Sequence, residues 1–294
     1  MQALRQRAEQ LAAALPPLMV AAERVAATVA QGVHGRRRTG VGDSFWQYRS
    51  YQQTDPSTAV DWRQSAKRDR LYVRQNEWEA AESVWLWADS SPSMNWRGAE
   101  ARPTKAERAA ILTLALAALL VRGGERIALL DSPRAPATGK PALDRLVEAL
   151  ALRKPDQAGS LPPLRELPRF ARVVMVSDFL SPLAEVEALV RGFAAMGVDG
   201  HLVQVLDPAE LDLPFEGRVR FDGLEGEGSH VVPRVELLAD DWRRRMEARR
   251  ETLADFCRRA GWTYALHRTD LAPQTALLAL YAALGGERAL RGRG

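Results

Sequence analysis

The motif with the most specific chemistry in this sequence is Asp89-Ser90-Ser91-Pro92-Ser93, which places one carboxylate and two hydroxyls at every second position. Small oxygen ligands of this kind suit hard cations such as Mg²⁺, and no thiolate or imidazole stands among them. A serine-rich turn can also cap the helix that follows it, because serine hydroxyls accept hydrogen bonds from free backbone N–H groups. The motif therefore predicts either a cation site or a helix cap.

A short apolar segment at 84–88, made of β-branched, aromatic and aliphatic residues, precedes this motif and is typical of a buried strand that opens into a loop. A similar segment at 172–176 is followed by Ser177 and Asp178. Ligands of parallel sheets bind beyond the carboxyl ends of the strands, so Asp89 and Asp178 are expected to converge there. Considered alone, Asp178 could instead cap a helix before Pro182.

Strands and helices alternate from residue 83 onward. Nearly continuous apolar strands separated by helices of this length indicate an α/β fold with a mostly parallel sheet covered by helices on both faces. The expected strands are 84–88, 126–130, 172–176, 202–206 and 263–267, and the expected helices are 104–122, 142–152, 183–196, 239–259 and 273–284.

Changes in composition divide the chain into parts. Residues 1–31 are rich in alanine and predict a helical segment, whereas residues 32–80 are rich in arginine and aromatic residues and predict a small β-rich module. The α/β domain is expected at 81–284, followed by a frayed tail at 285–294. A glycine-containing stretch at 213–235 predicts a β-hairpin inserted after the fourth strand, which could join the β-rich module.

The overall composition is that of an ordinary soluble globular chain. Its 294 residues are 46% hydrophobic, and its single cysteine, Cys257, excludes an intramolecular disulfide. The formal net charge is only +4, but residues 32–74 hold nine basic against four acidic residues and residues 207–241 hold ten acidic against three basic. Two surfaces of opposite charge are therefore expected.

Two apolar stretches could be mistaken for export or membrane segments. The first, at 11–22, is interrupted by Pro16-Pro17. The second, at 109–121, is too short to cross the roughly 30 Å core of a bilayer and is expected to be a core helix. We therefore expect a cytoplasmic chain.

Several further motifs complete a family pattern. Together with the Asp89 loop they resemble the domain of unknown function 58 family over roughly residues 22–284. The resemblance implies a von Willebrand factor type A fold with a β-rich addition, and a partnership with MoxR-type AAA+ ATPases. The motifs are Gly40-Val41-Gly42, Arg49-Ser50-Tyr51, Asp61-Trp62-Arg63, Glu77-Trp78-Glu79, Ser177-Asp178-Phe179 and Asp207-Pro208-Ala209-Glu210.

The same resemblance implies a metal-ion-dependent adhesion site built from three loops. The second loop of such a site normally supplies a threonine, and here Ser160 or, as its rival, Thr138 takes that place. A bound Mg²⁺ or Mn²⁺ would keep an open position, which the carboxylate of a partner protein could complete. The implied ligands are Asp89, Ser91 and Ser93 in the first loop, Ser160 in the second and Asp178 in the third.

Enzyme hypotheses fit the sequence less well. A haloacid-dehalogenase phosphatase also carries an aspartate after its first strand, but its second aspartate, two positions on, is Ser91 here, so the nucleophile has no partner acid. The four histidines are scattered without metal-ligand spacing. A hydrolase or phosphatase centred on Asp89 and Asp178 is our third hypothesis.

The arginine and aromatic residues between 34 and 74 suggest a second hypothesis, in which arginines neutralise phosphates and aromatic rings stack on bases. The modest net charge favours a protein partner or an internal acidic surface over nucleic acid. The candidate partner-binding residues in this segment are His34, Arg36, Arg49, Asp61, Arg63 and Arg74.

The sequence therefore favours a non-enzymatic, metal-dependent protein-interaction module. Its expected cofactor is Mg²⁺ or Mn²⁺, and the family resemblance alone implies its expected partner, a MoxR-type AAA+ ATPase that would contact the metal through a carboxylate.

Overall fold

The computed structural model describes residues 20, 22–30, 45–50, 72–76, 83–100, 102–153 and 159–291, and at 45–50, 72–76 and 285–291 it describes the backbone alone. The chain forms two compact units. One comprises Met1–Arg36 with Glu82–Gly294, and the other comprises Arg37–Ala81. In the smaller unit, β1 (Phe45–Ser50) and β2 (Tyr72–Asn76) pair antiparallel.

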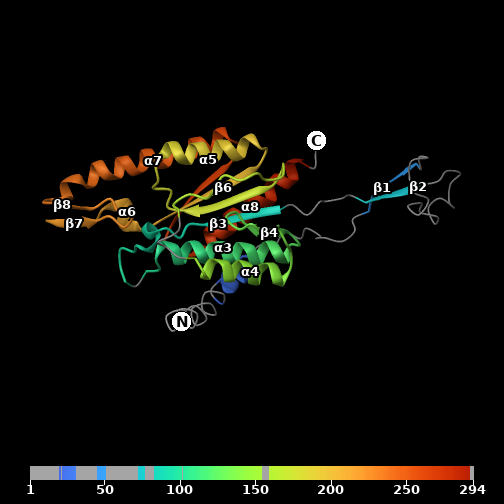
Figure 1. Ribbon diagram of the computed structural model, residues 1–294, viewed down its shortest axis with the longest axis horizontal. Coiled ribbons are helices and arrows are strands. Elements are labelled where there is room, and N and C mark those ends of the chain that lie inside the picture. The colour runs from blue at the N-terminus through green and yellow to red at the C-terminus, as the bar shows by residue number, and fades with distance from the viewer. Residues whose placement is uncertain are drawn as a thin grey trace. The chain divides into compact units, whose positions relative to one another are not determined.

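A five-stranded parallel sheet forms the centre of the larger unit (Figure 1). Its strands are β3 (Ser83–Ala88), β4 (Arg126–Leu129), β5 (Arg172–Ser177), β6 (Asp199–Leu206) and β9 (Thr263–Arg268). All neighbouring pairs are parallel, in the order β4-β3-β5-β6-β9. The predicted α/β class and the five predicted strands are confirmed.

Helices cover both faces of this sheet, which explains why its inner strands are apolar throughout. On one face, residues such as Leu86 and Val174 pack with α3 (Lys105–Arg122), α4 (Lys140–Ala151), α8 (Pro273–Arg291) and the helical residues 22–30. On the other face, residues such as Trp87 and Met175 pack with α5 (Leu183–Ala195) and α7 (Ala239–Arg259). Figure 1 shows α5 and α7 on the side of the sheet opposite α3 and α4.

Helix α3 is the central helix of the first face. Thr104 and Glu107 form a reciprocal capping box at its start, which satisfies backbone N–H groups that have no partner within the helix. Its apolar residues from Leu112 to Leu120 are almost all buried, so the stretch at 109–121 is a core helix as predicted. Among the described residues, no helix is long and apolar enough to cross a membrane.

The strand order reverses direction between β3 and β5. The chain goes from β3 to β4 on one side and then crosses to β5 on the other side of β3. Crossovers from adjacent strands leave in opposite directions at such a point, which opens a crevice at the carboxyl ends of the two strands. Asp89 follows β3 and Asp178 follows β5, so the topology brings both residues to this crevice.

Short elements surround the carboxyl end of the sheet. They are η2 (Pro92–Asn95), α6 (Pro208–Asp212), β7 (Val219–Asp222), β8 (Ser229–Val232) and η4 (Val235–Leu238). Strands β7 and β8 form the expected hairpin after the fourth strand of the large sheet. Within the described residues, β7–β8 and β1–β2 are separate two-stranded sheets. Helix α8 continues past its predicted end at Leu284 to Arg291.

Candidate functional site

Asp89 is a buried carboxylate that directly follows β3. Its backbone N–H donates to the carbonyl of Val176 at 2.8 Å, which extends the pairing of β3 with β5 by one residue. Its side chain is only 2% exposed; Oδ1 accepts from the Ser91 N–H at 2.8 Å and Oδ2 accepts from the Ser177 hydroxyl at 2.7 Å. Among the described residues, no cation pairs with this carboxylate.

The pKa of Asp89 reflects this environment. The pKa is raised from 3.8 to about 6: burial is the largest cause, the hydrogen bonds from Ser177 and Ser91 oppose it, and the nearby charge of Asp178 contributes to the rise. A buried carboxylate that lacks a cation costs free energy to ionise. A cation beside it would therefore relieve this cost.

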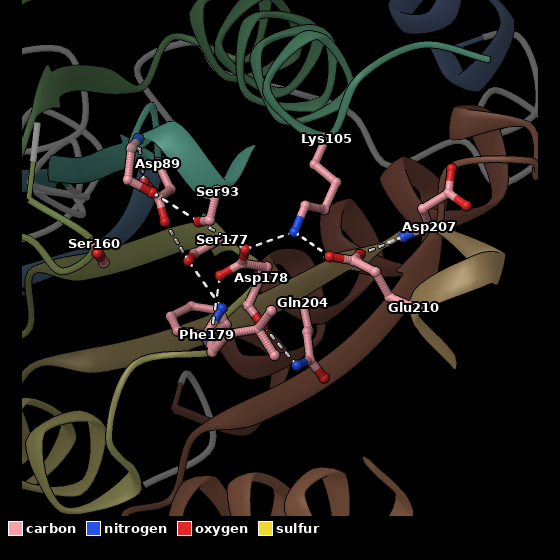
Figure 2. Close-up of polar contacts among 12 residues, drawn as sticks. Asp89, Ser93, Lys105, Ser160, Ser177, Asp178, Phe179, Gln204, Asp207 and Glu210 are labelled. Atoms are coloured by element: carbon pink, nitrogen blue, oxygen red, sulfur yellow. Dashed lines mark hydrogen bonds and ion pairs between the residues drawn. The ribbon is translucent and has the colours of Figure 1, made fainter. Parts of the chain in front are cut away.

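The serine hydroxyls of the first loop contact each other and Asp178 rather than a helix end. Ser91 Oγ lies 3.2 Å from Ser93 Oγ, and Ser93 Oγ donates to Asp178 Oδ2 at 3.1 Å (Figure 2). Ser91 stands at the start of η2, but its side chain makes no capping hydrogen bond. The alternative of a simple helix cap is therefore wrong for this loop.

Asp178 is held by both its side chain and its backbone. Oδ1 accepts from the N–H of Leu180 at 3.1 Å, and the carbonyl oxygen accepts from Gln204 Nε2 at 2.7 Å. Gln204 is fixed in turn by the Tyr264 hydroxyl, which donates to its Oε1 at 2.6 Å. Helix α5 starts after Pro182 without a side-chain cap, so the capping alternative for Asp178 is also wrong.

The turn after Asp178 has an unusual backbone. Phe179 is fully buried and adopts a positive φ of 47°, a region that non-glycine residues rarely occupy. The Ser177 hydroxyl accepts from its N–H at 3.0 Å, and the Arg249 guanidinium donates to its carbonyl. Strained conformations that surrounding contacts hold in place are concentrated at functional sites, so this turn supports a functional role for the crevice.

Lys105 is a component of the site that the sequence did not reveal. Figure 2 shows it reaching from α3 between Asp178 and Glu210, with Nζ 2.7 Å from Asp178 Oδ2 and 2.6 Å from Glu210 Oε1. Its side chain is 1% exposed. Burial opposes its charge, but the attraction of both carboxylates outweighs burial and raises the pKa of Lys105 above its ordinary value.

Glu210 is positioned by its own helix end. Its Oε2 accepts from the N–H of Asp207, which forms the capping box of α6, and its Oε1 is left for Lys105. In the sequence, the motif Asp207-Pro208-Ala209-Glu210 indicates only the family resemblance. The capping pattern could have located Glu210 at a helix start, but nothing in the sequence indicated that it would meet Lys105.

The two candidates for the second loop lie in different surroundings. Ser160 Oγ donates to Glu225 Oε2 at 3.2 Å, and Ser93 N donates to Oε1 of the same carboxylate at 3.4 Å. One carboxylate therefore connects Ser160 to the first loop. Ala137 pairs antiparallel with Ile127, so the chain at Thr138 runs toward the amino end of β4, away from the crevice.

These residues form a donor set of hydroxyls and two carboxylates, which fits a hard cation. Lys105 already shares Asp178, so the negative charge left for a metal comes mainly from Asp89. No group of three or more His, Cys, Asp or Glu side chains is placed to hold a metal ion in the part of the chain that the structure describes. Oxygen donors of this kind are those that Mg²⁺ and Mn²⁺ take in proteins, and the set includes none of the Cys or His side chains that softer transition metals prefer.

Comparison with known families agrees with the motifs of the sequence. Residues 47–252, more than half of the chain, match the family described as protein of unknown function DUF58. The chain belongs to the DUF58 family. The matched residues include parts of both units. Membership of the family assigns no activity.

Two relatives of this DUF58 chain come from mycobacteria. Uncharacterized protein Rv1480 of Mycobacterium tuberculosis and Uncharacterized protein Mb1516 of Mycobacterium bovis are each 29% identical to it over 280 residues, which covers 89% of this chain and 86% of the relative.

Solved structures give weaker likenesses. The conserved hypothetical protein BatB from Bacteroides thetaiotaomicron is 15% identical, with 70% of this chain and 99% of that chain covered and a TM-score of 0.42. An aerotolerance-related membrane protein from Bacteroides fragilis is 16% identical, with 67% and 96% covered and a TM-score of 0.41. Likenesses of this degree support no conclusion about the function of the DUF58 chain.

Two of the predicted partner-binding residues lie on the described strands of the smaller unit. Arg49 and Arg74 lie on β1 and β2, where Arg49 pairs with Val73 and Tyr48 with Arg74 through the backbone. The remaining candidates, His34, Arg36, Asp61 and Arg63, lie outside the described residues. The nucleic-acid hypothesis for residues 34–74 therefore stays a prediction.

Proposed function

We propose that this DUF58 chain is a protein-interaction module whose docking point is a divalent cation, Mg²⁺ or Mn²⁺, at the carboxyl ends of β3 and β5. The single observation that carries the proposal is Asp89, a buried carboxylate that meets only neutral hydrogen-bond donors and lies near a second carboxylate. The residues that would hold the cation are Asp89, Ser91, Ser93, Asp178 and Ser160.

The cation, when bound, would supply a coordination position for an oxygen of a partner protein. The chain itself fixes the donors. Ser177 and the Ser91 N–H orient Asp89, whereas Gln204 and Leu180 orient Asp178. None of these contacts aligns a nucleophile with a proton donor, so the arrangement supports binding better than hydrolysis.

Lys105 sets the strength of this proposed site. Its ammonium neutralises part of the charge on Asp178, so the crevice holds less free negative charge than its carboxylates alone would provide. We infer a weak metal site in which cation and partner carboxylate bind together. The family resemblance implies a MoxR-type AAA+ ATPase as the proposed partner, for which the chain would act as an adaptor.

A binding assay tests this function. The purified chain is immobilised and exposed to the purified MoxR-type ATPase in Mg²⁺ or in excess chelator. Retention is expected in Mg²⁺ alone, and Asp89→Asn is expected to abolish it, whereas Asp144→Asn on the exposed face of α4 leaves it unchanged. Retention that persists in chelator or in Asp89→Asn would overturn the proposal.

A further inference from the structure

The hairpin of β7 and β8 reaches over the candidate site through its connecting loop. The loop closes with a hydrogen bond from Gly223 N to Gly228 O at 2.7 Å, and Gly226 and Gly228 adopt φ values of 95° and 86°. Such values suit glycine, because it has no Cβ to clash with the backbone. This tight loop presents Glu225.

Glu225 contacts two of the proposed ligand residues at once. Its Oε1 accepts from the Ser93 N–H at 3.4 Å and its Oε2 accepts from the Ser160 hydroxyl at 3.2 Å. Ser93 follows β3 and Ser160 precedes β5, so three separate segments meet at one carboxylate. The Glu225 backbone is braced by its own N–H, which donates to Glu227 Oε2 at 2.9 Å.

The hairpin is weakly anchored elsewhere. Its strand residues are exposed or half-buried, and its loop residues are exposed. The described contacts at its base are an edge-to-face pair of Phe215 and Phe221 at 6.1 Å, a hydrogen bond from Gly217 N to Glu236 at 2.8 Å and a backbone hydrogen bond from Val235 N to Gly217 O at 3.0 Å. Elements with so little buried apolar contact open at low free-energy cost. The hairpin can therefore move while the sheet stays folded.

We propose that Glu225 is a carboxylate supplied by the chain itself at the place where a partner's carboxylate docks, so that the β7–β8 hairpin closes the site until a partner displaces it. The inference rests on the proposed function, because it assigns to Glu225 the oxygen-donor role that a partner would otherwise fill. It also adds regulation: a partner competes with the hairpin, and its apparent affinity depends on the fraction of open molecules.

The closed position is tested first in metal-free protein by hydrogen exchange. Glu225→Ala removes both contacts to Ser93 and Ser160, so exchange of the backbone amides at 219–232 is expected to speed up on the order of tenfold. Glu216→Ala is the matched control, because Glu216 is exposed at the base of the same hairpin and no described contact links it to the site. Equal exchange in the two variants would overturn the closing role.

The competition is tested with Mn²⁺ and acetate as probes. In the wild-type chain loaded with Mn²⁺, water-proton relaxation is expected to respond little to acetate, because Glu225 excludes it. In Glu225→Ala the bound Mn²⁺ is expected to gain exchangeable water, and acetate then displaces that water at a concentration about tenfold lower than in Glu216→Ala.

The outcomes separate the two proposals. If the wild-type chain and both variants bind no Mn²⁺, the proposed function fails, and the hydrogen-exchange result alone decides whether Glu225 holds the hairpin. If Mn²⁺ binds but acetate acts equally on Glu225→Ala and Glu216→Ala, the metal site stands and the role of Glu225 is overturned.

Discussion

The two aspartates of the crevice differ in the charge that each one meets. Asp178 is paired with the buried ammonium of Lys105, whereas the described partners of Asp89 are neutral groups of Ser91 and Ser177. The sequence made the two residues look equivalent, because each follows a buried strand. Lys105 was not distinguishable from any other lysine in the first turn of a helix. Its role depends on contacts with residues more than seventy positions away, which no local pattern shows.

Substitution of Lys105 should show how far the fold depends on this internal cation. Lys105→Met leaves the carboxylates of Asp178 and Glu210 buried without their counter-charge, so the free energy of unfolding is expected to fall by about 3–5 kcal/mol at neutral pH. Urea unfolding measures the loss.

The matched control for this substitution is Lys140→Met, since Lys140 is exposed at the start of α4. Its free energy of unfolding is expected to stay near that of the wild type. Adding Glu210→Gln to Lys105→Met should recover part of the loss, because one uncompensated charge is removed. A loss below about 1 kcal/mol in Lys105→Met would show that the ion pair is not needed for stability.

His201 should make the stability of the chain depend on pH. It is fully buried on β6, and burial together with the charge of Arg172 lowers its pKa from 6.5 to about 4. The unfolded chain therefore takes up a proton that the folded chain refuses as the pH falls from 6.5 toward 4. The stability present above pH 6.5 is lost across this interval, by about 3 kcal/mol for a shift of this size.

Urea unfolding at a series of pH values between 7 and 4 checks this expectation. His201→Gln should flatten the curve, whereas His230→Gln should not, because His230 is exposed on β8. Two other groups still titrate in the His201 variant, with effects of opposite sign: His267, whose pKa burial lowers to about 4, and Asp89, whose pKa burial raises to about 6. An unchanged slope in His201→Gln would contradict the assignment.

At the scale of elements, the residues at the carboxyl end of the sheet could be predicted from the sequence. The contact between the β7–β8 hairpin and the loop after β3 could not. The pattern of an apolar strand followed by polar residues located Asp89 and Asp178, because it depends only on residues that are neighbours in the sequence. Glycine and alternating residues located the hairpin, but Glu225 meets Ser93 across 132 positions of sequence. That contact depends on the angle at which the hairpin leaves the sheet, which no periodicity encodes.

The start of strand β6 offers a test of the packing at the amino end of the sheet. Gly200 lies directly under the buried ring of Trp262, where a Cβ would come within 2.1 Å of ring atoms. Gly200→Ala must therefore displace the ring, its stacking with Phe193 and its hydrogen bond to the carbonyl of Val198. Thermal unfolding is expected to show a loss of about 1–3 kcal/mol.

The control for this substitution is Gly159→Ala, where the added Cβ meets its nearest atom at an ordinary 3.5 Å. A loss in Gly200→Ala no larger than in Gly159→Ala would show that the Trp262 ring adapts without cost.

At the scale of the whole molecule, the sequence predicted the sheet, its helices and its family more fully than it predicted function. The alternation of apolar strands and amphipathic helices depends on burial, which all parallel α/β folds share. The finer assignment to a von Willebrand A fold and the cytoplasmic location stay predictions. The uneven charge of residues 32–74 also stays open as a nucleic-acid hypothesis, which steep salt dependence of binding to DNA would favour.

The proposed docking and the proposed closure by Glu225 both depend on the binding of a divalent cation beside Asp89. Asp89→Asn is its most specific perturbation, because asparagine can still accept from the Ser91 N–H and donate to the Ser177 hydroxyl while losing the charge. The metal-free variant is expected to stay folded, since it buries a neutral group where the wild type buries a carboxylate.

The midpoint of thermal unfolding, followed in a titration with Mg²⁺ and in one with Mn²⁺, tests the binding of this cation most directly. A cation at ten times its dissociation constant should stabilise the wild-type chain by about 1.4 kcal/mol and raise its midpoint by a few degrees. The same rise is expected in Asp144→Asn and none in Asp89→Asn. A wild-type midpoint unmoved by either metal, or an equal rise in Asp89→Asn, would contradict a cation at this site.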